Sequence, residues 1–393
     1  MIPLHMDQAS TLALWVFLFF LFGGWLYRIG RALSELRHAP MLKPCSTDAR
    51  KGSVSVLIPA KNEALNIADC VRSFLPQLGD TDEVIVINNS STDDTETILR
   101  SLGAQTITPG SSESPPPGKV PLKYLNTPPT PEDWTGKNFA LHLGIQHAHG
   151  DWFLFTDADT RHQPGSINAS VSLAEKSSLD LLTLLPRCLA HGFWENLVQP
   201  CAMAYMGLWF PLREVNDPRS KTFFANGQYL LIRKDHYTKV GGHLAVKAAF
   251  LEDFALMKKT KEMSRHGFCG FGMDVYGTRM YGSFEAIWRG WRRIFLHAYE
   301  RRPALLFRCF ASVVCFSVLP LVILVGSLTG SRELLILSAL ITALSLGTAV
   351  KAYSIVRARK AYALLHPFAA MIFAGILCDA FRMALFKQRT HWR

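Results

Sequence analysis

The sequence lacks the cysteine and charge patterns of several common protein classes. Its 8 cysteines include no C-x-x-C pair and no zinc-like spacing, which indicates reduced thiols rather than a metal site or a disulfide framework. Only 19% of the residues are charged, whereas 49% are hydrophobic. The chain is therefore too apolar for an ordinary soluble domain, and a membrane component is expected.

Four charge-free runs predict membrane helices. Residues 8–27 lack Asp, Glu, Lys and Arg over 20 positions, which suffices to cross about 30 Å of hydrocarbon. No basic segment precedes this run and no small-residue cleavage site follows it, so we interpret it as an uncleaved anchor. Further runs cover residues 309–331, 334–350 and 361–378. For the last, interrupted by His366-Pro367, we favour a re-entrant or interfacial segment over a full crossing, because a crossing would place the basic tail outside.

The basic residues are concentrated beside these runs. Lys and Arg number 42 against 31 Asp and Glu. Because much of the surplus flanks apolar segments, it indicates contact with anionic lipid headgroups and no nucleic-acid partner. Arg28 and Arg31 directly follow the first run, which predicts that the chain from residue 28 onward is cytoplasmic.

The middle of the chain has the pattern of an α/β domain. Between residues 52 and about 300, short β-branched runs alternate with helical stretches. VSVLIP (54–59) and EVIVIN (83–88) are predicted strands, each followed by a predicted helix. Residues 109–131 contain 8 prolines and are expected to form a loop over the site. Such sheets bind ligands at the carboxyl ends of their strands, where the segments 59–63 and 88–89 would lie.

Two acids follow the next predicted strand, WFLFT (152–156). In TDAD, Asp157 and Asp159 stand two residues apart, and side chains two apart on a strand point the same way. Carboxylate oxygens suit Mg²⁺ or Mn²⁺, which would bridge a substrate diphosphate. The alternative is an ordinary solvated turn, because the D-x-D spacing alone is common.

Several further motifs occur in a characteristic order, and their combination is much more specific than D-x-D alone. They are IPAKNE, WTGK-x-x-AL, TDAD, ANGQY-x-x-x-R, GGH and LED, followed by a Trp/Arg cluster before the second apolar run. The set resembles family-2 glycosyltransferases with a GT-A fold. More narrowly it is similar to membrane-anchored bacterial enzymes that glycosylate carotenoid or hopanoid-type lipids, and more distantly to ceramide glucosyltransferases.

The resemblance implies an architecture. It predicts an α/β GT-A catalytic domain with a mixed, Rossmann-like sheet over residues 52–300, between an N-terminal anchor (1–30) and a C-terminal membrane domain with a basic tail (304–393). One N-terminal and two to three C-terminal transmembrane helices are expected. The protein would be a multi-pass protein of the bacterial inner membrane, with its catalytic domain on the cytoplasmic face.

The resemblance also implies roles for the acids. Asp159 would be the principal metal ligand, and Asp157 would contact ribose or metal-bound water. Glu252 and Asp253 match the family's acidic pair, in which the second acid is the catalytic base. A carboxylate in that place can accept the acceptor's hydroxyl proton. The alternative for Asp253 is a partner for the dipole of the helix it begins.

Donor and acceptor contacts are implied as well, with alternatives from the residues themselves. The nucleotide pocket would be lined by Pro59, Ala60 and Glu63. Lys137 binds the diphosphate or is a solvated cation at a helix start. Gln228 shapes the acceptor pocket or satisfies a buried backbone group.

Two motifs depart from the family pattern. Family members usually carry Asp-Asp after the second strand, where this chain has Asn88-Asn89. The Asn89 carbonyl can accept a hydrogen bond from uracil but supplies no charge, and Asp93 or Asp94 could partly compensate.

The second departure is WRGWRRIF (288–295), which differs from Q/R-x-x-R-W by an Arg where the Trp should be. Arg292 would clamp the diphosphate and Trp291 would cover the acceptor. Alternatively, this segment is simply an interfacial helix among headgroups. The aromatic-rich stretch 191–218 is expected to form the lipid acceptor's entry or an ordinary core helix.

These observations predict an inverting, metal-dependent transfer of a single sugar. The donor would be a nucleoside-diphosphate sugar, most simply a UDP-hexose, and the acceptor a membrane lipid at the cytoplasmic face. Three or four helices are few to enclose a polysaccharide tunnel, so a processive synthase subunit is the second hypothesis. The third is a non-catalytic protein that binds nucleotide sugar or lipid.

Overall fold

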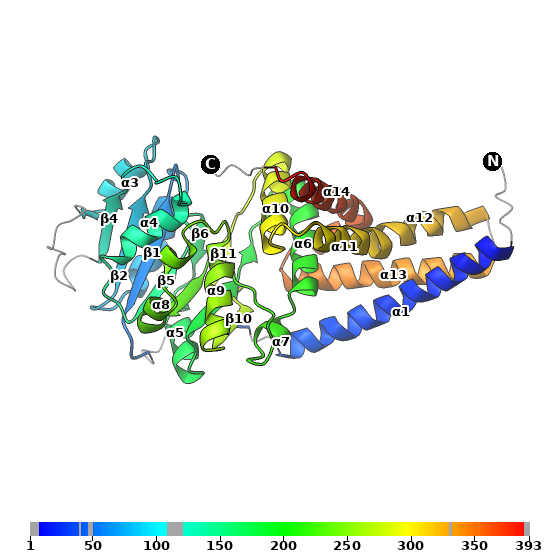
Figure 1. Cartoon of the computed structure of the whole chain (residues 1–393), viewed down its shortest axis with the longest axis horizontal. Helices are drawn as coiled ribbons and strands as arrows, with labels where there is room; N and C mark the ends of the chain where they lie inside the picture. The colour runs from blue at the N-terminus through cyan, green and yellow to red at the C-terminus, as the bar shows by residue number, and fades with distance from the viewer. Residues whose placement is uncertain (1–7, 39–40, 46–49, 108–120, 330–331, 389–393) are drawn as a thin grey trace. The chain divides into compact units, whose positions relative to one another are not determined.

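A computed structural model describes residues 8–38, 41–45, 50–107, 121–329 and 332–388 (Figure 1). Contacts divide the chain into two compact units. The sheet unit comprises Ala39–Leu189 and Phe210–Met280, and the helical unit comprises Met1–His38, Ala190–Trp209 and Tyr281–His391. The segments 190–209 and 281–300, which we had assigned to the catalytic domain, thus group with the helical unit.

The sheet unit is built on a mixed sheet of 8 strands in the order β10-β7-β9-β5-β1-β2-β4-β3. Within it, β9 is antiparallel to both of its neighbours, and the other pairs are parallel. A smaller sheet has the order β6-β11-β8. The strands are β1 Val54–Ala60, β2 Glu83–Asn88, β3 Gln105–Thr106, β4 Leu122–Asn126, β5 Trp152–Phe155, β6 Thr160–His162, β7 Leu181–Leu185, β8 Arg187–Cys188, β9 Leu230–Arg233, β10 Gly267–Phe271 and β11 Tyr276–Thr278.

Helices cover this sheet. They are α2 Ile67–Phe74, η1 Leu75–Gln77, α3 Thr95–Ser101, α4 Gly136–Ile145, α5 Ser166–Lys176, α7 Leu212–Val215, α8 Lys234–Lys239, η2 His243–Val246 and α9 Glu252–Met263. This is the mixed α/β arrangement that the sequence predicts. One expectation was wrong: β4 lies within residues 109–131, which we had predicted to be entirely loop. Residues 109–120 of that stretch lie outside the described part.

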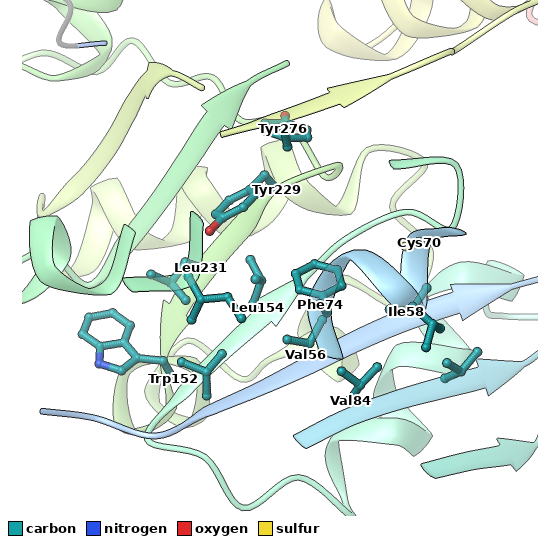
Figure 2. Close-up of a cluster of buried hydrophobic side chains, with 14 of the residues drawn as sticks. Val56, Ile58, Cys70, Phe74, Val84, Trp152, Leu154, Tyr229, Leu231 and Tyr276 are labelled. Atoms are coloured by element: carbon teal, nitrogen blue, oxygen red, sulfur yellow. The ribbon is translucent and has the colours of Figure 1, made fainter. Parts of the chain in front are cut away.

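The central strands are apolar on both faces because each face carries its own hydrophobic core. Val56 and Ile58 of β1 pack with Phe74 of α2 and with Val84 in one core (Figure 2). The intervening Leu57 points to the other core, with Ile85, Ile87 and Leu141. Since a strand buried on both faces needs no polar alternation, the continuous apolar runs in the sequence are explained.

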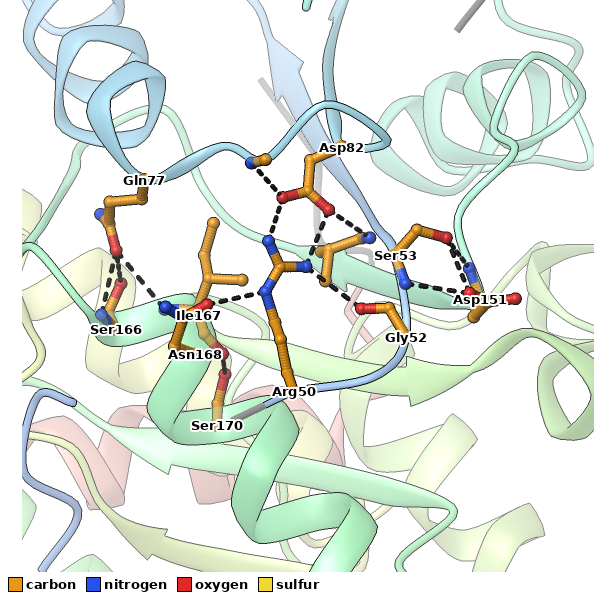
Figure 3. A network of polar contacts seen from close by, with 12 residues as sticks. Arg50, Gly52, Ser53, Gln77, Asp82, Asp151, Ser166, Ile167, Asn168 and Ser170 are labelled. Atoms are coloured by element: carbon orange, nitrogen blue, oxygen red, sulfur yellow. Dashed lines mark hydrogen bonds and ion pairs between the residues drawn. The ribbon is translucent and has the colours of Figure 1, made fainter. Parts of the chain in front are cut away.

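A buried ion pair fixes the beginning of β1. The Arg50 guanidinium forms a bidentate pair with Asp82, donates to the Asn168 side chain at 2.7 Å and donates to the Gly52 carbonyl at 3.1 Å (Figure 3). Asp82 also accepts hydrogen bonds from the backbone N–H groups of Val54 at 2.8 Å and Gly79 at 2.7 Å. The Asp82 side chain is fully buried, so its charge depends on these donors.

This pair predicts a purely structural variant. Arg50→Met removes the cation and leaves the buried Asp82 carboxylate uncompensated, which we expect to lower the free energy of unfolding by about 3 kcal/mol. The melting temperature of the detergent-solubilised protein should fall by several degrees. Arg219→Met is the matched control, because the Arg219 side chain is 88% exposed in its pair with Asp217 and such pairs contribute about 0–1 kcal/mol. Equal melting temperatures for the two variants would contradict the prediction.

The helical unit is built from helices. Its helices are α1 Gln8–His38, α6 Phe193–Trp209, α10 Phe284–Ala298, α11 Pro303–Val313, a π-helical turn η3 Val314–Val318, α12 Leu319–Gly326, η4 Ser327–Thr329, α13 Arg332–Ile355, η5 Lys360–Leu365 and α14 His366–Leu385. Four segments among the described residues are long and apolar enough to cross a membrane: Leu12–Ser34, Pro303–Gly326, Arg332–Ile355 and Lys360–Leu385. The predicted count of one N-terminal and two to three C-terminal apolar helices is confirmed at this level.

The π-helical turn docks α1. Pro320 has no N–H to donate to the Phe316 carbonyl four residues earlier, and that carbonyl instead accepts a hydrogen bond from the Trp25 indole at 3.1 Å. Arg28 lies over the Phe316 ring at 3.6 Å and donates to the Ser312 hydroxyl at 2.7 Å. A Cβ at Gly24 would collide with the Phe316 ring, so glycine is needed for this approach.

Candidate active site

The loops that follow β1 and β2 are tied to each other by hydrogen bonds. Asn62, with φ of 57°, accepts from the Thr92 N–H at 2.8 Å, and the Glu63 N–H donates to the Thr95 hydroxyl at 2.9 Å. The Asp93 carboxylate accepts from the N–H groups of Ala64 and Thr95. Asp93 therefore braces the two loops, and this use of its carboxylate argues against the compensating role considered for it beside Asn88-Asn89.

Asn88 and Asn89, which stand where family members usually carry two aspartates, are both buried and hydrogen-bonded. The Asn88 amide donates to the Asn126 side chain at 2.7 Å. The Asn89 side-chain oxygen accepts from the Thr127 hydroxyl at 3.0 Å, and the Asn89 backbone N–H donates to the Ala60 carbonyl at 2.8 Å. Pro59 and Ala60 pair with Ile87 and Asn88 at the ends of β1 and β2, so this edge carries amides in place of the usual carboxylates.

The acidic pair Asp157 and Asp159 lies in a turn between β5 and β6. The strand ends at Phe155, so our expectation that both acids extend a strand was wrong. Side-chain hydroxyl groups hold this turn. The Thr160 hydroxyl donates to the Asp157 carbonyl at 2.7 Å, and Thr156 donates to the Gln228 carbonyl at 2.8 Å.

His162 organises these hydroxyl groups. Its Nε2 lies 3.1 Å from the Thr156 hydroxyl and 2.9 Å from the Thr160 hydroxyl, and its ring stacks on Tyr276 with 5.4 Å between centroids. Burial, assisted by nearby Arg161, lowers the pKa of His162 to about 3, so the ring is neutral. Sequence reasoning missed this residue, although a histidine that alternates with Thr160 on a short strand was a visible signal.

Asp159 carries a buried oxygen with no protein partner. Its Oδ1 makes no hydrogen bond within the described structure. Burial, together with the charges of Asp157 and Glu63, raises the pKa of Asp159 to about 7. Burial likewise raises the pKa of Glu63, whose carboxylate accepts from the Asn66 side chain at 2.9 Å. A cation beside Asp159 would give Oδ1 a partner and would reduce the repulsion between the neighbouring carboxylates.

Lys137 joins the two acidic motifs. Its Nζ lies 2.7 Å from Asp157 and 2.7 Å from Glu252, with 15% of the side chain exposed. Burial alone would lower the pKa of Lys137, but the two carboxylates raise it above its usual value. The alternative of a solvated cation at a helix start is therefore excluded for this conformation, whereas binding to a diphosphate stays a prediction.

Glu252 and Asp253 begin α9. Asp253 accepts from the Gly227 N–H at 2.6 Å through one oxygen and from the Phe254 N–H at 2.8 Å through the other. Burial, followed by the charge of Glu252, raises the pKa of Asp253 to about 7. The contact with Phe254 is the helix-start interaction considered above. However, a carboxylate used only for that purpose would not require burial beside a second acid.

Two amide side chains fix the surroundings of the acids. Gln228 is buried, donates to the Thr278 hydroxyl at 3.3 Å and accepts from the Asn226 side chain at 3.4 Å; these partners are side chains, and not the backbone group considered for it. Asn138, fully buried on α4, donates to the carbonyls of Val246, Lys247 and Ala249. Sequence reasoning missed Asn138, which holds the loop leading to Glu252. The available signal was an amide side chain in the first turn of the helix, directly before the apolar run FALHLGI.

Gly227 lets three site residues converge. A Cβ there would lie 3.0 Å from Glu252 Oε1, 3.1 Å from Lys137 Nζ and 3.4 Å from Asp253 Oδ2. We expect Gly227→Ala to displace these groups by a few tenths of an ångström and to lower kcat/KM by about tenfold or more, with little loss of melting temperature. Gly207→Ala is the control, because a Cβ at Gly207 meets nothing within 4 Å. Wild-type kinetics in Gly227→Ala would show that the spacing of these groups is not critical.

Arg292 and Trp291 lie in the helical unit on α10. Arg292 forms an ion pair with Asp379 of α14 at 2.8 Å. Trp291 is buried against Phe295, and its indole N–H has no hydrogen-bond partner among the described residues. Their proposed contacts with diphosphate and acceptor stay predictions, and the structure gives each of them a role inside the helical unit.

Comparison with known proteins identifies one domain of the chain. Residues 55–237 match the model of glycosyl transferase family 2. The chain carries a glycosyltransferase family 2 domain. The predicted family is thereby confirmed for this part of the chain, and the predicted enzyme class agrees with it.

Relatives and solved structures agree with this assignment. A 4,4'-diaponeurosporenoate glycosyltransferase of Staphylococcus aureus strain MRSA252 is 26% identical over 67% of this chain, and one of strain USA300 is 25% identical over the same share. The alignment spans 66% of each relative, a little under two thirds of its length. A solved structure, the mannosyltransferase PcManGT from Pyrobaculum calidifontis in complex with GDP-Man and Mn²⁺, superposes with a TM-score of 0.53 at 16% identity, covering 96% of this chain and 100% of that one. This last likeness supports the GT-A fold.

Proposed function

We propose that this glycosyltransferase moves a single sugar from a nucleoside-diphosphate sugar, most simply a UDP-hexose, to a membrane lipid, with inversion at the anomeric carbon. The observation that carries the proposal is the grouping of Asp157, Asp159, Lys137 and Asp253 in one small region of the sheet unit. Two acids and a cation suit a diphosphate with its metal ion, and a separate buried acid remains for the acceptor.

The residues present fit a divalent cation bound together with substrate. Among the described residues no group of three or more His, Cys, Asp or Glu side chains forms a ready-made metal site. Mg²⁺ and Mn²⁺ at such sites are typically held by one or two carboxylates plus substrate phosphates and water. Asp159, with its unpartnered buried oxygen, and Asp157 would hold the ion. When bound, it would stabilise negative charge on the departing nucleoside diphosphate.

The remaining residues divide the other tasks. Lys137 would orient the diphosphate through its ammonium group. Asp253 would accept the proton of the acceptor hydroxyl as that oxygen attacks the anomeric carbon, and the N–H groups of Gly227 and Phe254 hold this carboxylate in place. A single displacement of this kind inverts the anomeric centre. Asn89 would accept from the nucleobase through its carbonyl oxygen.

A lipid acceptor is supported by two independent facts. The named relatives are 4,4'-diaponeurosporenoate glycosyltransferases, and we infer a lipid acceptor for this chain from that likeness. This chain contains apolar helices long enough to cross a membrane, so its acceptor can reside in the bilayer to which the enzyme is bound. We further propose that the sheet unit faces the cytoplasm at the bacterial inner membrane, because Arg28 and Arg31 follow the first apolar run.

The experiment that tests the function is a transfer assay on detergent-purified protein. UDP- and GDP-sugars are supplied with Mn²⁺, Mg²⁺ or EDTA and a total bacterial lipid extract, and products are read by mass spectrometry. A lipid that gains one hexose mass only in the presence of metal supports the proposal. A ladder of sugar masses would instead indicate a polymerising synthase. Nucleotide-sugar binding without any turnover would indicate the non-catalytic alternative.

The pKa of Asp253 predicts the acid limb of the pH profile. A base must be deprotonated to act, and the pKa of Asp253 is raised to about 7. At saturating metal, kcat/KM should therefore be constant above about pH 8 and fall about tenfold per unit below pH 7. The residual activity of Asp253→Asn should lack this limb. A wild-type profile that stays flat down to pH 5 would contradict the role of Asp253.

A further inference from the structure

The apolar helix α14 begins beside the end of the charge-free part of α1. His366, its first residue, places Nε2 at 3.0 Å from the Ser317 hydroxyl. The neighbouring Phe316 lies under the guanidinium of Arg28, the first charged residue after the apolar run of α1. The start of α14 is thus level with the boundary charge of α1. The apolar half of α1 lies beyond this level and packs Leu18 and Leu21 against Ile341 of α13.

The segment that leads into α14 comes from the charged end of α13. Ala349 and Tyr353 of α13 pack with Ala363 of η5, and these two residues flank Lys351, the first charge after the apolar run 334–350. The Tyr353 hydroxyl also donates to the Leu197 carbonyl of α6 at 2.8 Å. Two independent boundary charges, on α1 and on α13, therefore mark the same level for the entry into α14.

From this level α14 runs back along α11, away from α12. Phe381 contacts Phe307 with 5.9 Å between ring centroids, and Arg301 donates to the carbonyls of Met383 and Gln388. Ser317 lies nine residues after Arg308, so α14 accompanies α11 over about 14 Å between the level of Arg28 and that of Arg308. In Figure 1, α14 lies beside α11 and ends near α10, whereas α1, α12 and α13 continue together.

Asp379, the acid within α14, finds its hydrogen-bond partners on α10 and α14. Asp379 accepts from the Trp288 indole at 3.0 Å and from Arg292 at 2.8 Å, both on α10, and pairs with Arg382 at 3.0 Å. In a helix that crossed the bilayer alone, such a charge would be costly. Here α10, an amphipathic helix rich in Arg, provides the partners.

We propose that α14 does not cross the bilayer but lies in the leaflet on the Arg28 side, so that the chain crosses three times. Length and composition alone would count a fourth crossing. The outer face of α14 would contact lipids of that leaflet, because its large apolar side chains are exposed. Phe368 and Met371 of α14 and Leu364 of η5 are 42%, 47% and 67% exposed. Exposed basic groups beyond them, Arg382 and Lys387, match anionic headgroups. This inference does not depend on the proposed reaction.

Labelling of single cysteines tests the topology in the full chain. Lys51→Cys in the sheet unit, Leu328→Cys between α12 and α13, and Gln388→Cys after α14 are made in a background in which Cys45, Cys315 and Cys378 are serine. Intact cells are treated with a membrane-impermeant maleimide before and after permeabilisation. We expect Gln388→Cys to label like Lys51→Cys and opposite to Leu328→Cys. Labelling of Gln388→Cys together with Leu328→Cys would overturn the proposal.

Depth in the bilayer can also be measured on the purified protein in vesicles. Nitroxide labels at Phe368, Met371 and Leu385, all exposed, are placed in vesicles of phosphatidylcholine and phosphatidylglycerol, and depth is read from collisions with oxygen and a water-soluble nickel complex. We expect depth to decrease steadily from Phe368 to Leu385. A maximum at the middle position, with both ends shallow, would show a crossing helix. The unchanged parent protein and a label at exposed Ile336 of α13 are the references.

Discussion

Asp253→Asn is expected to abolish sugar transfer while leaving the fold and donor binding intact. A positioned general base contributes about 10²–10⁴-fold to rate, so kcat should fall by about a thousandfold. The variant amide has one oxygen, so it can accept from only one of the N–H groups of Gly227 and Phe254, and its NH₂ group faces the other. The substitution also removes a carboxylate whose ionised form is disfavoured by burial and by Glu252. Because these two effects oppose each other, the melting temperature at pH 8 should change by only a few degrees.

The measurements for this variant are kcat, the donor KM and the melting temperature. Glu262→Gln is the matched control, because it neutralises an exposed acid on the same helix and should leave all three values unchanged. A correctly folded Asp253→Asn enzyme with near-normal turnover would remove Asp253 from the mechanism. Loss of turnover together with a collapsed melting temperature in Asp253→Asn would point to a structural role at the start of α9.

Lys137→Met is expected to have opposite effects on two ligands. The ammonium group lies 2.7 Å from both Asp157 and Glu252, where it provides the positive charge that these acids need. Without it, a divalent cation meets no competing charge, so Mn²⁺ alone should bind several-fold more tightly. The diphosphate loses a charged hydrogen bond worth about 1.5–3 kcal/mol. UDP affinity and kcat/KM should therefore fall by about tenfold to a hundredfold.

Titration of Mn²⁺ by electron paramagnetic resonance and calorimetry with UDP measure the two affinities directly. Lys239→Met is the matched control, because Lys239 also pairs with a carboxylate, that of Asp235, but is 63% exposed. Lys137→Arg keeps the charge and should restore much of the UDP affinity. If Lys137→Met weakened Mn²⁺ and UDP binding equally and also lowered the melting temperature, Lys137 would be a structural ion-pair partner only.

Much of the fold follows from local pattern, and the failures have a physical cause. The runs at 54–59 and 83–88 are apolar at most positions, as a strand buried on both faces requires, and both are strands. The run WFLFT misled us at its end: the Thr156 N–H still donates to the Leu57 carbonyl, but the strand ends at Phe155 and the two acids lie in a turn. Likewise β4 was missed because its neighbours in sequence are prolines, whereas its stability comes from pairing with β2.

The candidate site shows a similar division. Acids at strand ends are visible in sequence because carboxyl ends of parallel strands gather at one edge. Their supports are not: Asn138 reaches carbonyls more than a hundred residues away, and His162 acts through hydroxyl groups. Such contacts depend on side-chain packing between distant segments, which no local period encodes. The ion pair of Lys137 with both acidic motifs was also beyond reach, although the residue itself was singled out.

The composition of the helical unit from three separated stretches has a consequence for biogenesis. Trp25 and Arg28 leave the ribosome first, yet their partners Phe316 and Ser312 follow almost 300 residues later. The first helix must therefore wait in the bilayer, with an indole N–H and a guanidinium unpaired, until the whole sheet unit and the π-helical turn have been synthesised. Contacts of such long range form slowly, and a helix waiting in this way is exposed to quality-control proteases. Maturation of this enzyme should accordingly be limited by the docking of its own N-terminal helix.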